Sequence, residues 1–221
     1  MPVILKIERK DGQRTAVWEI KEDEHALLEK ASLNKAALES FHLITNPGRR
    51  LEWLAVRALL KELYPRGLPT IAYLKNGKPV LIDHTDKISI SHSGKMVAIA
   101  LHSDRNPGID IEILHPRILK IATRFLGVME KEYSGTHPTI EQLTIIWGAK
   151  EVMFKVYEHG GISFKNDFRI SPFTLSEKGP LEGFIDKDTI VTIPMEYIKI
   201  GNFILVQTDY SVRDFEKKSD L

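Results

Sequence analysis

The chain has 221 residues, which is enough for one large domain or for two domains of about 110 residues. Lys and Arg total 31 against 30 Asp and Glu, and this balance disfavours a nucleic-acid-binding or membrane-surface protein. The absence of cysteine excludes a disulfide framework and thiolate metal sites. The opening MPVILKIERKDG is too short an apolar run for a signal peptide, and no segment has the roughly 20 apolar residues of a membrane span. We therefore expect a soluble, cytoplasmic protein that binds neither nucleic acid nor membrane.

The first half predicts a mixture of strands and helices. Alternating strand patterns occupy residues 3–8, 15–20, 71–74, 79–82, 88–91 and 96–101. Helical spacing occupies residues 22–31, 35–44 and 49–64. Asp11-Gly12 and Asn76-Gly77 predict hairpin turns, SHSG at 91–94 predicts a turn between two strands, and Asn46-Pro47-Gly48 is expected to break the chain.

The second half follows a turn at residues 104–107 (DRNP). We expect a strand in GIDIEI (108–113), helices at 117–125, 128–133 and 139–158, and strands at 168–170, 181–185, 190–194 and 203–208. The final FEKKSDL is expected to be a polar, frayed tail. These patterns predict an α+β fold with two lobes, residues 1–105 and 106–221.

GIDIEI combines apolar residues with two acids. Side chains alternate along a strand, so Ile109 and Ile111 are expected on one face and Asp110 and Glu112 on the other. Taken alone, this pattern fits a solvated acidic face as well as a cation site.

WGAKEVMFK (147–155) lies in the longest predicted helix. Positions four apart share a helical face, so Glu151 and Lys155 align in one row. Alone, this is an ordinary amphipathic helix. Gly148 costs about 1 kcal/mol relative to Ala inside a helix, so it either permits a close approach or is merely tolerated.

Together the two segments predict more than either does alone. Asp110, Glu112 and Glu151 supply three carboxylates if the helix packs across the strand, and Mg²⁺ commonly binds a few carboxylates together with substrate phosphate. The cations and donors that we expect to hold a phosphate-bearing ligand are Lys78, His92, Lys150 and Lys155.

The ordered segments GKP (77–79), ISISHSG (88–94), GIDIE (108–112) and WGAKEVMFK resemble the 4′-phosphopantetheinyl transferase superfamily. The resemblance covers residues 49–170, and the chain length resembles that of the long, monomeric, surfactin-synthetase-activating type. It implies two α+β lobes related by a pseudo-twofold axis, with coenzyme A and Mg²⁺ in the cleft between them. It also implies transfer of the 4′-phosphopantetheine arm from coenzyme A to a serine of an apo acyl or peptidyl carrier protein, with release of adenosine 3′,5′-bisphosphate.

The resemblance assigns roles by motif position. The expected metal ligands are Asp110, Glu112 and Glu151, the expected catalytic pair is Glu151 and Lys155, and the expected coenzyme A contacts are Arg57, Lys78, Ser91, His92 and Lys155. Arg49 and Arg50 are read as surface charges. The serine proton is accepted either by Glu151 or by a water on the metal ion, and the sequence leaves both open.

Other functions remain as alternatives. A catalytically idle relative could bind coenzyme A or carrier proteins as an adaptor, and a structural domain could use the same charges in surface ion pairs. For the carrier we expect a mixed basic and apolar patch, formed by Lys120, Arg124 and Lys131 with Ile121, Phe125, Leu126 and Met129, unless the apolar members are core. The pathway that the carrier serves is left open.

Overall fold

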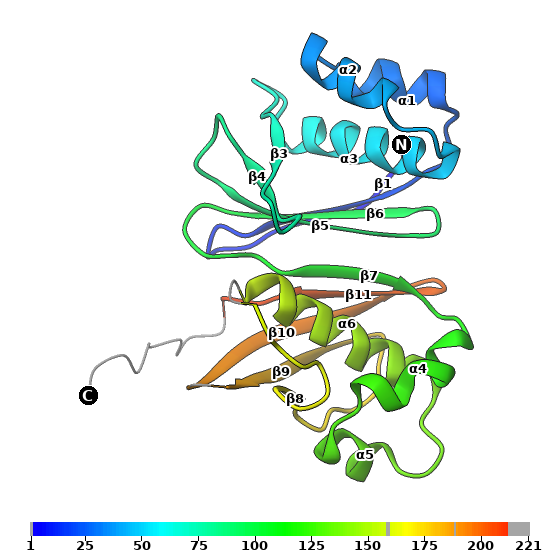
Figure 1. Ribbon diagram of the computed structural model, residues 1–221, viewed down its shortest axis with the longest axis vertical. Helices are drawn as coiled ribbons and strands as arrows, with labels where there is room; N and C mark the ends of the chain where they lie inside the picture. Colours follow the sequence, from blue (N-terminus) through cyan, green and yellow to red (C-terminus); the bar gives the residue numbers. More distant parts are fainter. Residues whose placement is uncertain (1, 158–159, 188, 212–221) are drawn as a thin grey trace.

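A computed structural model describes residues 2–157, 160–187 and 189–211 (Figure 1). The predicted α+β class is confirmed. Within these residues no helix is both long enough and apolar enough to span a membrane. The predicted frayed tail, residues 215–221, lies outside the described residues.

The first part of the chain forms a four-stranded antiparallel sheet in the order β1-β2-β6-β5. Its strands are β1 (Val3–Glu8), β2 (Arg14–Glu19), β5 (Lys87–Ser93) and β6 (Met96–His102). The helices are α1 (Glu24–Ala31), α2 (Lys35–His42) and α3 (Pro47–Leu63). A separate two-stranded hairpin consists of β3 (Ile71–Tyr73) and β4 (Pro79–Leu81).

The later part forms a five-stranded sheet in the order β7-β11-β10-β9-β8. Its strands are β7 (Ile109–Ile113), β8 (Phe168–Ile170), β9 (Lys178–Asp186), β10 (Ile190–Ile200) and β11 (Phe203–Thr208). Its helices are α4 (Arg117–Phe125), α5 (Val128–Ser134) and α6 (Ile140–Val156).

The two sheets face each other, with helices on the outside (Figure 1). β6 is buried on both faces: Val97 and Ile99 pack toward the helices, and Ala98 and Ala100 pack toward the second sheet. Ile109 of β7 joins Ala98 and Ala100 in the apolar layer between the sheets. Because strand side chains alternate, this contact turns the acids of β7 away from that layer, toward α6.

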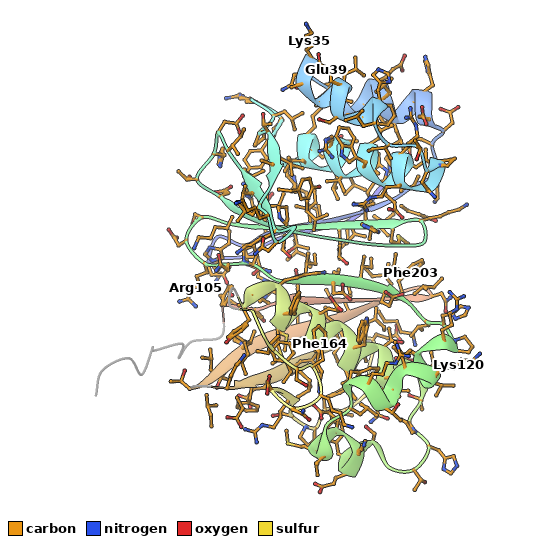
Figure 2. All side chains as sticks on the ribbon, in the orientation of Figure 1. Lys35, Glu39, Arg105, Lys120, Phe164 and Phe203 are labelled. Atoms are coloured by element: carbon orange, nitrogen blue, oxygen red, sulfur yellow. The ribbon has the colours of Figure 1, made fainter. Side chains whose placement is uncertain are left out.

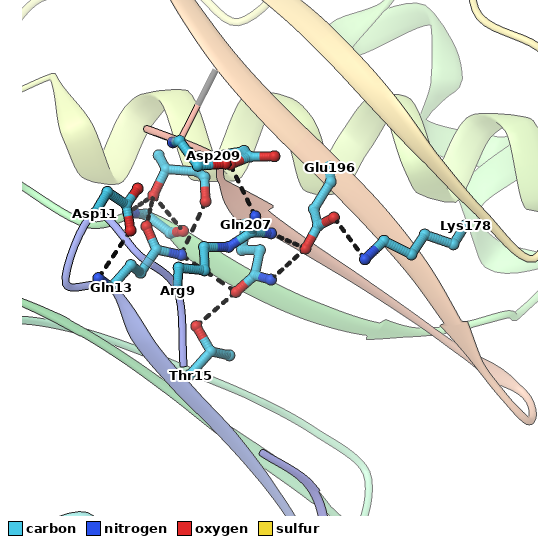
Figure 3. Close-up of polar contacts among 11 residues, drawn as sticks. Arg9, Asp11, Gln13, Thr15, Lys178, Glu196, Gln207 and Asp209 are labelled. Atoms are coloured by element: carbon cyan, nitrogen blue, oxygen red, sulfur yellow. Dashed lines mark hydrogen bonds and ion pairs between the residues drawn. The ribbon is translucent and has the colours of Figure 1, made fainter. Parts of the chain in front are cut away.

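A polar network joins the sheets at one end (Figure 3). Thr15 Oγ1 donates to Gln207 Oε1 at 2.6 Å, and Gln207 Nε2 donates to Glu196 Oε1 at 2.7 Å. Arg9 pairs with both Glu196 and Asp209. These contacts pair Thr15, Gln207, Glu196 and Arg9 across the junction, whereas the buried atoms Arg9 Nε and Asp11 Oδ2 have no hydrogen-bond partner among the described residues.

Three sequence predictions differ from the structure. Asn46-Pro47-Gly48 does not break the chain but begins α3: the Asn46 side chain accepts from Arg49 N, and Pro47 takes the first helical position. The turn predicted over SHSG includes only Gly94 of these residues, because β5 continues to Ser93, which pairs with Met96, and the turn is formed by Gly94 and Lys95. The strand predicted at 190–194 extends to Ile200. The lobe division at 105/106 stays a prediction; the chain passes from one sheet to the other in this loop.

Candidate active site

The acids of β7 lie beside α6. Ile109 and Ile111 are fully buried between the sheets, as the alternation predicts, and Asp110 is only 6% exposed. β7 pairs with β11, so Asp110 stands opposite Val206. For Asp110, the alternative of a solvated acidic face is therefore wrong.

Gly148 explains how α6 approaches this strand. A Cβ at this position would lie 2.9 Å from Val206 Cγ2 and 3.4 Å from Asp110 Oδ2. A larger residue would push the helix away from β11 and disturb Asp110. The glycine therefore permits a close approach, which decides between the two interpretations that the sequence left open.

Lys155 connects α6 to the acids. Its Nζ donates to Ile109 O at 2.7 Å and to Asp110 Oδ1 at 2.9 Å. Ser91 Oγ donates to the same Asp110 oxygen at 2.8 Å. Lys155 is therefore held beside Asp110. Its contact with the pyrophosphate of coenzyme A stays a prediction.

The three acids influence one another electrostatically. Burial raises the pKa of Glu151 to about 7; Asp110 and Glu112 raise it as well, while Lys155 opposes them. Burial also raises the pKa of Glu112, with Ser93 opposing and Asp110 adding to the rise. Like charges raise one another's pKa only when they are near, so the three acids are neighbours, and Lys155 contacts Asp110 directly.

The donor set suits a hard divalent cation. Among the described residues, no group of three His, Asp or Glu side chains forms a ready-made metal cage. Mg²⁺ does not need one, because it is usually held by one or two carboxylates, several waters and substrate phosphates. Oxygen donors that repel one another, with Lys155 as a nearby cation, fit this mode of binding.

Residues of the first sheet border the acids. Ser91 is buried beside Asp110, and His92, on the same strand, contacts Arg49 of α3. Glu52 lies 3.2 Å from Arg49 Nη1 and 3.4 Å from His92 Nδ1. Burial lowers the pKa of His92; Glu52 raises it and Arg49 lowers it. Arg49, which was expected to be a surface charge, therefore contacts His92, a predicted coenzyme A contact.

Two predicted coenzyme A contacts lie in other elements. Lys78 is at the β3–β4 turn, where its backbone N donates to Asn76 Oδ1. Arg57 is buried in α3, with its guanidinium carbon 3.1 Å from the centre of the Trp53 ring, and it lines a cavity of about 210 Å³. Burial lowers the pKa of Arg57 to about 10. The roles of both residues stay predictions.

The expectation that Lys150 could hold phosphate is wrong. Its side chain is fully buried, and Nζ lies 2.9 Å from Glu130 Oε1. Nζ also donates to the carbonyl oxygens of Phe125, Phe164 and Phe168. The ammonium group therefore has its partners inside the protein.

A groove of about 580 Å³ starts at Glu112 and runs along α4. Its apolar lining includes Ile118, Ile121 and Trp147, and its basic lining includes Lys120, which projects from α4 (Figure 2). The predicted patch needs a correction, because Phe125 and Leu126 are core residues. The exposed apolar side chains here are instead Leu119 and Val128.

Comparison with known proteins gives a consistent result. Residues 106–208 match the model of the 4′-phosphopantetheinyl transferase superfamily. The 4′-phosphopantetheinyl transferase AcpT of Escherichia coli O157:H7 is 37% identical over 125 residues, covering 53% of this chain and 62% of the relative. AcpT of Salmonella typhi is 34% identical over 124 residues, with the same shares. The 4′-phosphopantetheinyl transferase psf-1 of Bacillus pumilus is 32% identical over 154 residues, covering 66% of this chain and 64% of the relative.

The chain thus spans somewhat less than two thirds of each of these relatives. The family match includes β7, which carries Asp110 and Glu112, and α6, which carries Glu151 and Lys155. Residues 106–208, somewhat less than half of the chain, are therefore similar to the 4′-phosphopantetheinyl transferase superfamily.

Proposed function

We propose that the protein transfers the 4′-phosphopantetheine arm of coenzyme A to a serine of an apo carrier protein, releasing adenosine 3′,5′-bisphosphate. The observation that carries this proposal is the meeting of Asp110, Glu112, Glu151 and Lys155 inside the family-matched domain. The names of the relatives AcpT and psf-1 support the same reaction. We further propose that the protein is of the long, monomeric, surfactin-synthetase-activating type.

Coenzyme A would bind along β5, at the edge where this strand meets β7, because apolar side chains fill the layer between the sheets. His92 and Arg49 offer donors for its phosphates from the first sheet, and Lys155 offers one from α6. Lys78 and Arg57 would contribute from the hairpin and from α3. Glu52 holds Arg49 and His92 in place, so their orientation is set before the nucleotide arrives.

Asp110, Glu112 and Glu151 would hold Mg²⁺, directly or through water, because among the described residues no three of these side chains form a ready-made cage. The ion would neutralise charge on the pyrophosphate, which is the main requirement of phosphoryl-group transfer. Lys155 lies 2.9 Å from Asp110 Oδ1, so its positive charge is fixed next to this region. A fixed charge stabilises a developing negative charge without reorganisation during the reaction.

In the reaction, the carrier serine oxygen forms a bond to the β-phosphorus and the bond from this phosphorus to the bridging oxygen breaks. The bisphosphate leaves with the electron pair of the broken bond. Glu151, in the α6 row that contains Lys155, is one candidate acceptor for the serine proton, and water is the other. Lys155 can donate a proton to the leaving bisphosphate.

The groove beside Glu112 would receive the carrier protein. It combines apolar side chains with Lys120, and Arg124 is exposed on the same helix. Carriers in this family's reactions are generally acidic around their serine, so a basic rim with an apolar centre suits both encounter and binding.

Intact-mass spectrometry tests the proposed reaction. The protein is incubated with coenzyme A, Mg²⁺ and apo carriers of fatty acid, polyketide, peptide and lysine metabolism, with an Asp110→Ala variant as the control. We expect one carrier class to gain the mass of one phosphopantetheine group, with little or no gain from the variant. If no carrier changes mass while coenzyme A still binds, the chain is instead a binding adaptor.

A further inference from the structure

A row of serines connects the two sheets. β5 has serine at every second position, and the hydroxyl oxygens of Ser89, Ser91 and Ser93 accept from the amides of β7 at 3.2, 3.2 and 3.3 Å. The acceptors and donors advance together, from Ile109 N through Ile111 N to Ile113 N. β5 and β7 therefore run in parallel and are joined through side chains.

Two of the amides, those of Ile109 and Ile111, would otherwise be unpaired, whereas the Ile113 amide also donates to Glu112 Oε1. β7 pairs with β11 in an antiparallel ladder, in which successive residues alternate in the direction of their backbone groups. The amides of Ile109 and Ile111 point to the open edge of the second sheet, and the serine oxygens satisfy them. Each serine oxygen acts here as an acceptor, so its single hydroxyl proton is available for another partner.

Two of the hydroxyl protons go to the acids. Ser91 Oγ donates to Asp110 Oδ1 at 2.8 Å, and Ser93 Oγ donates to Glu112 Oε1 at 2.9 Å. The residue that corresponds to these acids for Ser89 is Gly108, immediately before Ile109, and it has no side chain to accept a bond. The row therefore contains its own control: Ser89 makes the same backbone contact and, in the described part of the chain, no carboxylate contact.

We propose that Ser93 is a positioning residue that orients Glu112 for a divalent cation, and that Ser91 does the same for Asp110. This inference rests on the proposed metal-dependent transfer. A free Glu side chain samples many rotamers, and ordering it has an entropic cost at the moment of metal binding. Ser93 and the amide of Ile113 both donate to Glu112 Oε1, so one oxygen of this carboxylate is held in advance.

The consequence is that the first sheet controls the metal site of the second. Ser93 lies on β5, outside residues 106–208, whereas Glu112 lies inside them. Partners that hydrogen-bond metal ligands typically change metal affinity by about 10–100-fold when they are removed. Ser93 is the better residue to test, because Ser91 is also a proposed coenzyme A contact.

The test measures Mn²⁺ binding rather than turnover. Mn²⁺ is titrated into the full-length protein with coenzyme A present, and the electron paramagnetic resonance signal of free Mn²⁺ reports the dissociation constant. The variants are Ser93→Ala, its matched control Ser89→Ala, and Ser93→Thr, which keeps a hydroxyl. Ser93→Cys is a further variant of nearly native size with a weak donor; the chain has no cysteine with which it could form an internal disulfide.

We expect Ser93→Ala to weaken Mn²⁺ binding by about tenfold or more. Ser89→Ala should bind Mn²⁺ as the parent does, although it leaves the Ile109 amide without its acceptor and should melt at a lower temperature. In Ser93→Ala the Ile113 amide keeps Glu112 Oε1 as an acceptor. Ser93→Thr should restore binding. Ser93→Cys should weaken Mn²⁺ binding measurably. Its Mn²⁺ dissociation constant replaces that of Ser93→Ala if the alanine variant does not fold.

Two outcomes would overturn the inference about Ser93 and leave the proposed metal-dependent transfer unaffected. One is parent-like Mn²⁺ affinity in Ser93→Ala, or in Ser93→Cys if that variant is used instead. The other is equal weakening in Ser89→Ala, which would show that the sheet junction matters and the carboxylate contact does not. If the parent itself binds no Mn²⁺ in the presence of coenzyme A, the proposed metal site is wrong and the role of Ser93 falls with it.

Discussion

Lys150 Nζ lies 2.9 Å from Glu130 Oε1, and neither side chain is exposed to solvent. Glu130 also accepts from Gly127 N at 2.9 Å and from Ile170 N at 3.0 Å. The pair therefore ties α6 to α5 and to β8 behind the residues of the site. Burial lowers the pKa of Lys150, and Glu130 opposes this shift because it favours the charged ammonium group.

We expect Lys150→Met to destabilise the protein by about 3–5 kcal/mol, because it leaves the charge of Glu130 buried without its partner. The double variant Lys150→Met/Glu130→Gln should lose less than the sum of the two single variants. Urea unfolding of the parent and the three variants gives the coupling energy. Additive losses would show that the two side chains do not stabilise each other.

The adjacent arginines of α3 should have different roles. Arg49 contacts His92, whereas Arg50 forms a two-bond pair with Glu24 and lies over the Phe41 ring. A charge-assisted contact contributes about 1.5–3 kcal/mol, so Arg49→Ala should raise the KM for coenzyme A by about tenfold or more. Arg50→Ala should lower the melting temperature and leave this KM unchanged. Steady-state kinetics and thermal melts compare the two, and equal effects on KM would contradict the assignment.

His102 should make stability depend on pH. It is 3% exposed, and its Nδ1 accepts from the amides of Asp104 and Arg105. Burial lowers its pKa below the ordinary 6.5; Asp11, Asp104 and Asp86 oppose this shift, and Arg105 adds to it. The unfolded chain therefore takes up a proton that the folded chain resists. The stabilisation is present above pH 6.5 and is lost as the pH falls below it.

The variant His102→Asn keeps an acceptor near the position of Nδ1 but does not titrate. Between pH 7.5 and 5 the parent should lose up to about 1.4 kcal/mol per pH unit more stability than this variant. Urea unfolding at several pH values measures the difference. Parallel pH profiles for the two proteins would rule out a contribution from His102.

Charge reversal tests the docking groove. Lys120→Glu and Arg124→Glu should raise the KM for the carrier and leave coenzyme A binding nearly unchanged, because both side chains are exposed on α4. Lys35→Glu is the matched control, since Lys35 is exposed on α2 at the opposite end of the molecule (Figure 2). The parent's KM for the carrier should rise with salt, because exposed charges are screened beyond about 10 Å at 0.1 M. If the α4 variants behave like Lys35→Glu, the carrier docks elsewhere.

Local periodicity predicted the parts of the site that lie within one element. The alternation of GIDIEI placed Ile109 and Asp110 on opposite faces, and the helical row placed Glu151 with Lys155. Contacts between distant segments could not be predicted this way. Glu130 reaches Lys150 from another helix, and the serines of β5 reach β7 from another sheet. Most of SHSG was misread as a turn because its serine and glycine content suits turns, whereas these serines satisfy the amides of a neighbouring strand.

The most direct test of the proposed reaction is its product balance. The protein, coenzyme A, Mg²⁺ and the modified carrier class are incubated together, and both products are quantified, with a carrier whose serine is replaced by alanine as the control. We predict one adenosine 3′,5′-bisphosphate for each phosphopantetheine group gained by the carrier, and neither product with the alanine carrier or with Asp110→Ala. Release of the bisphosphate without the carrier serine, or equal transfer by Asp110→Ala, would contradict this account.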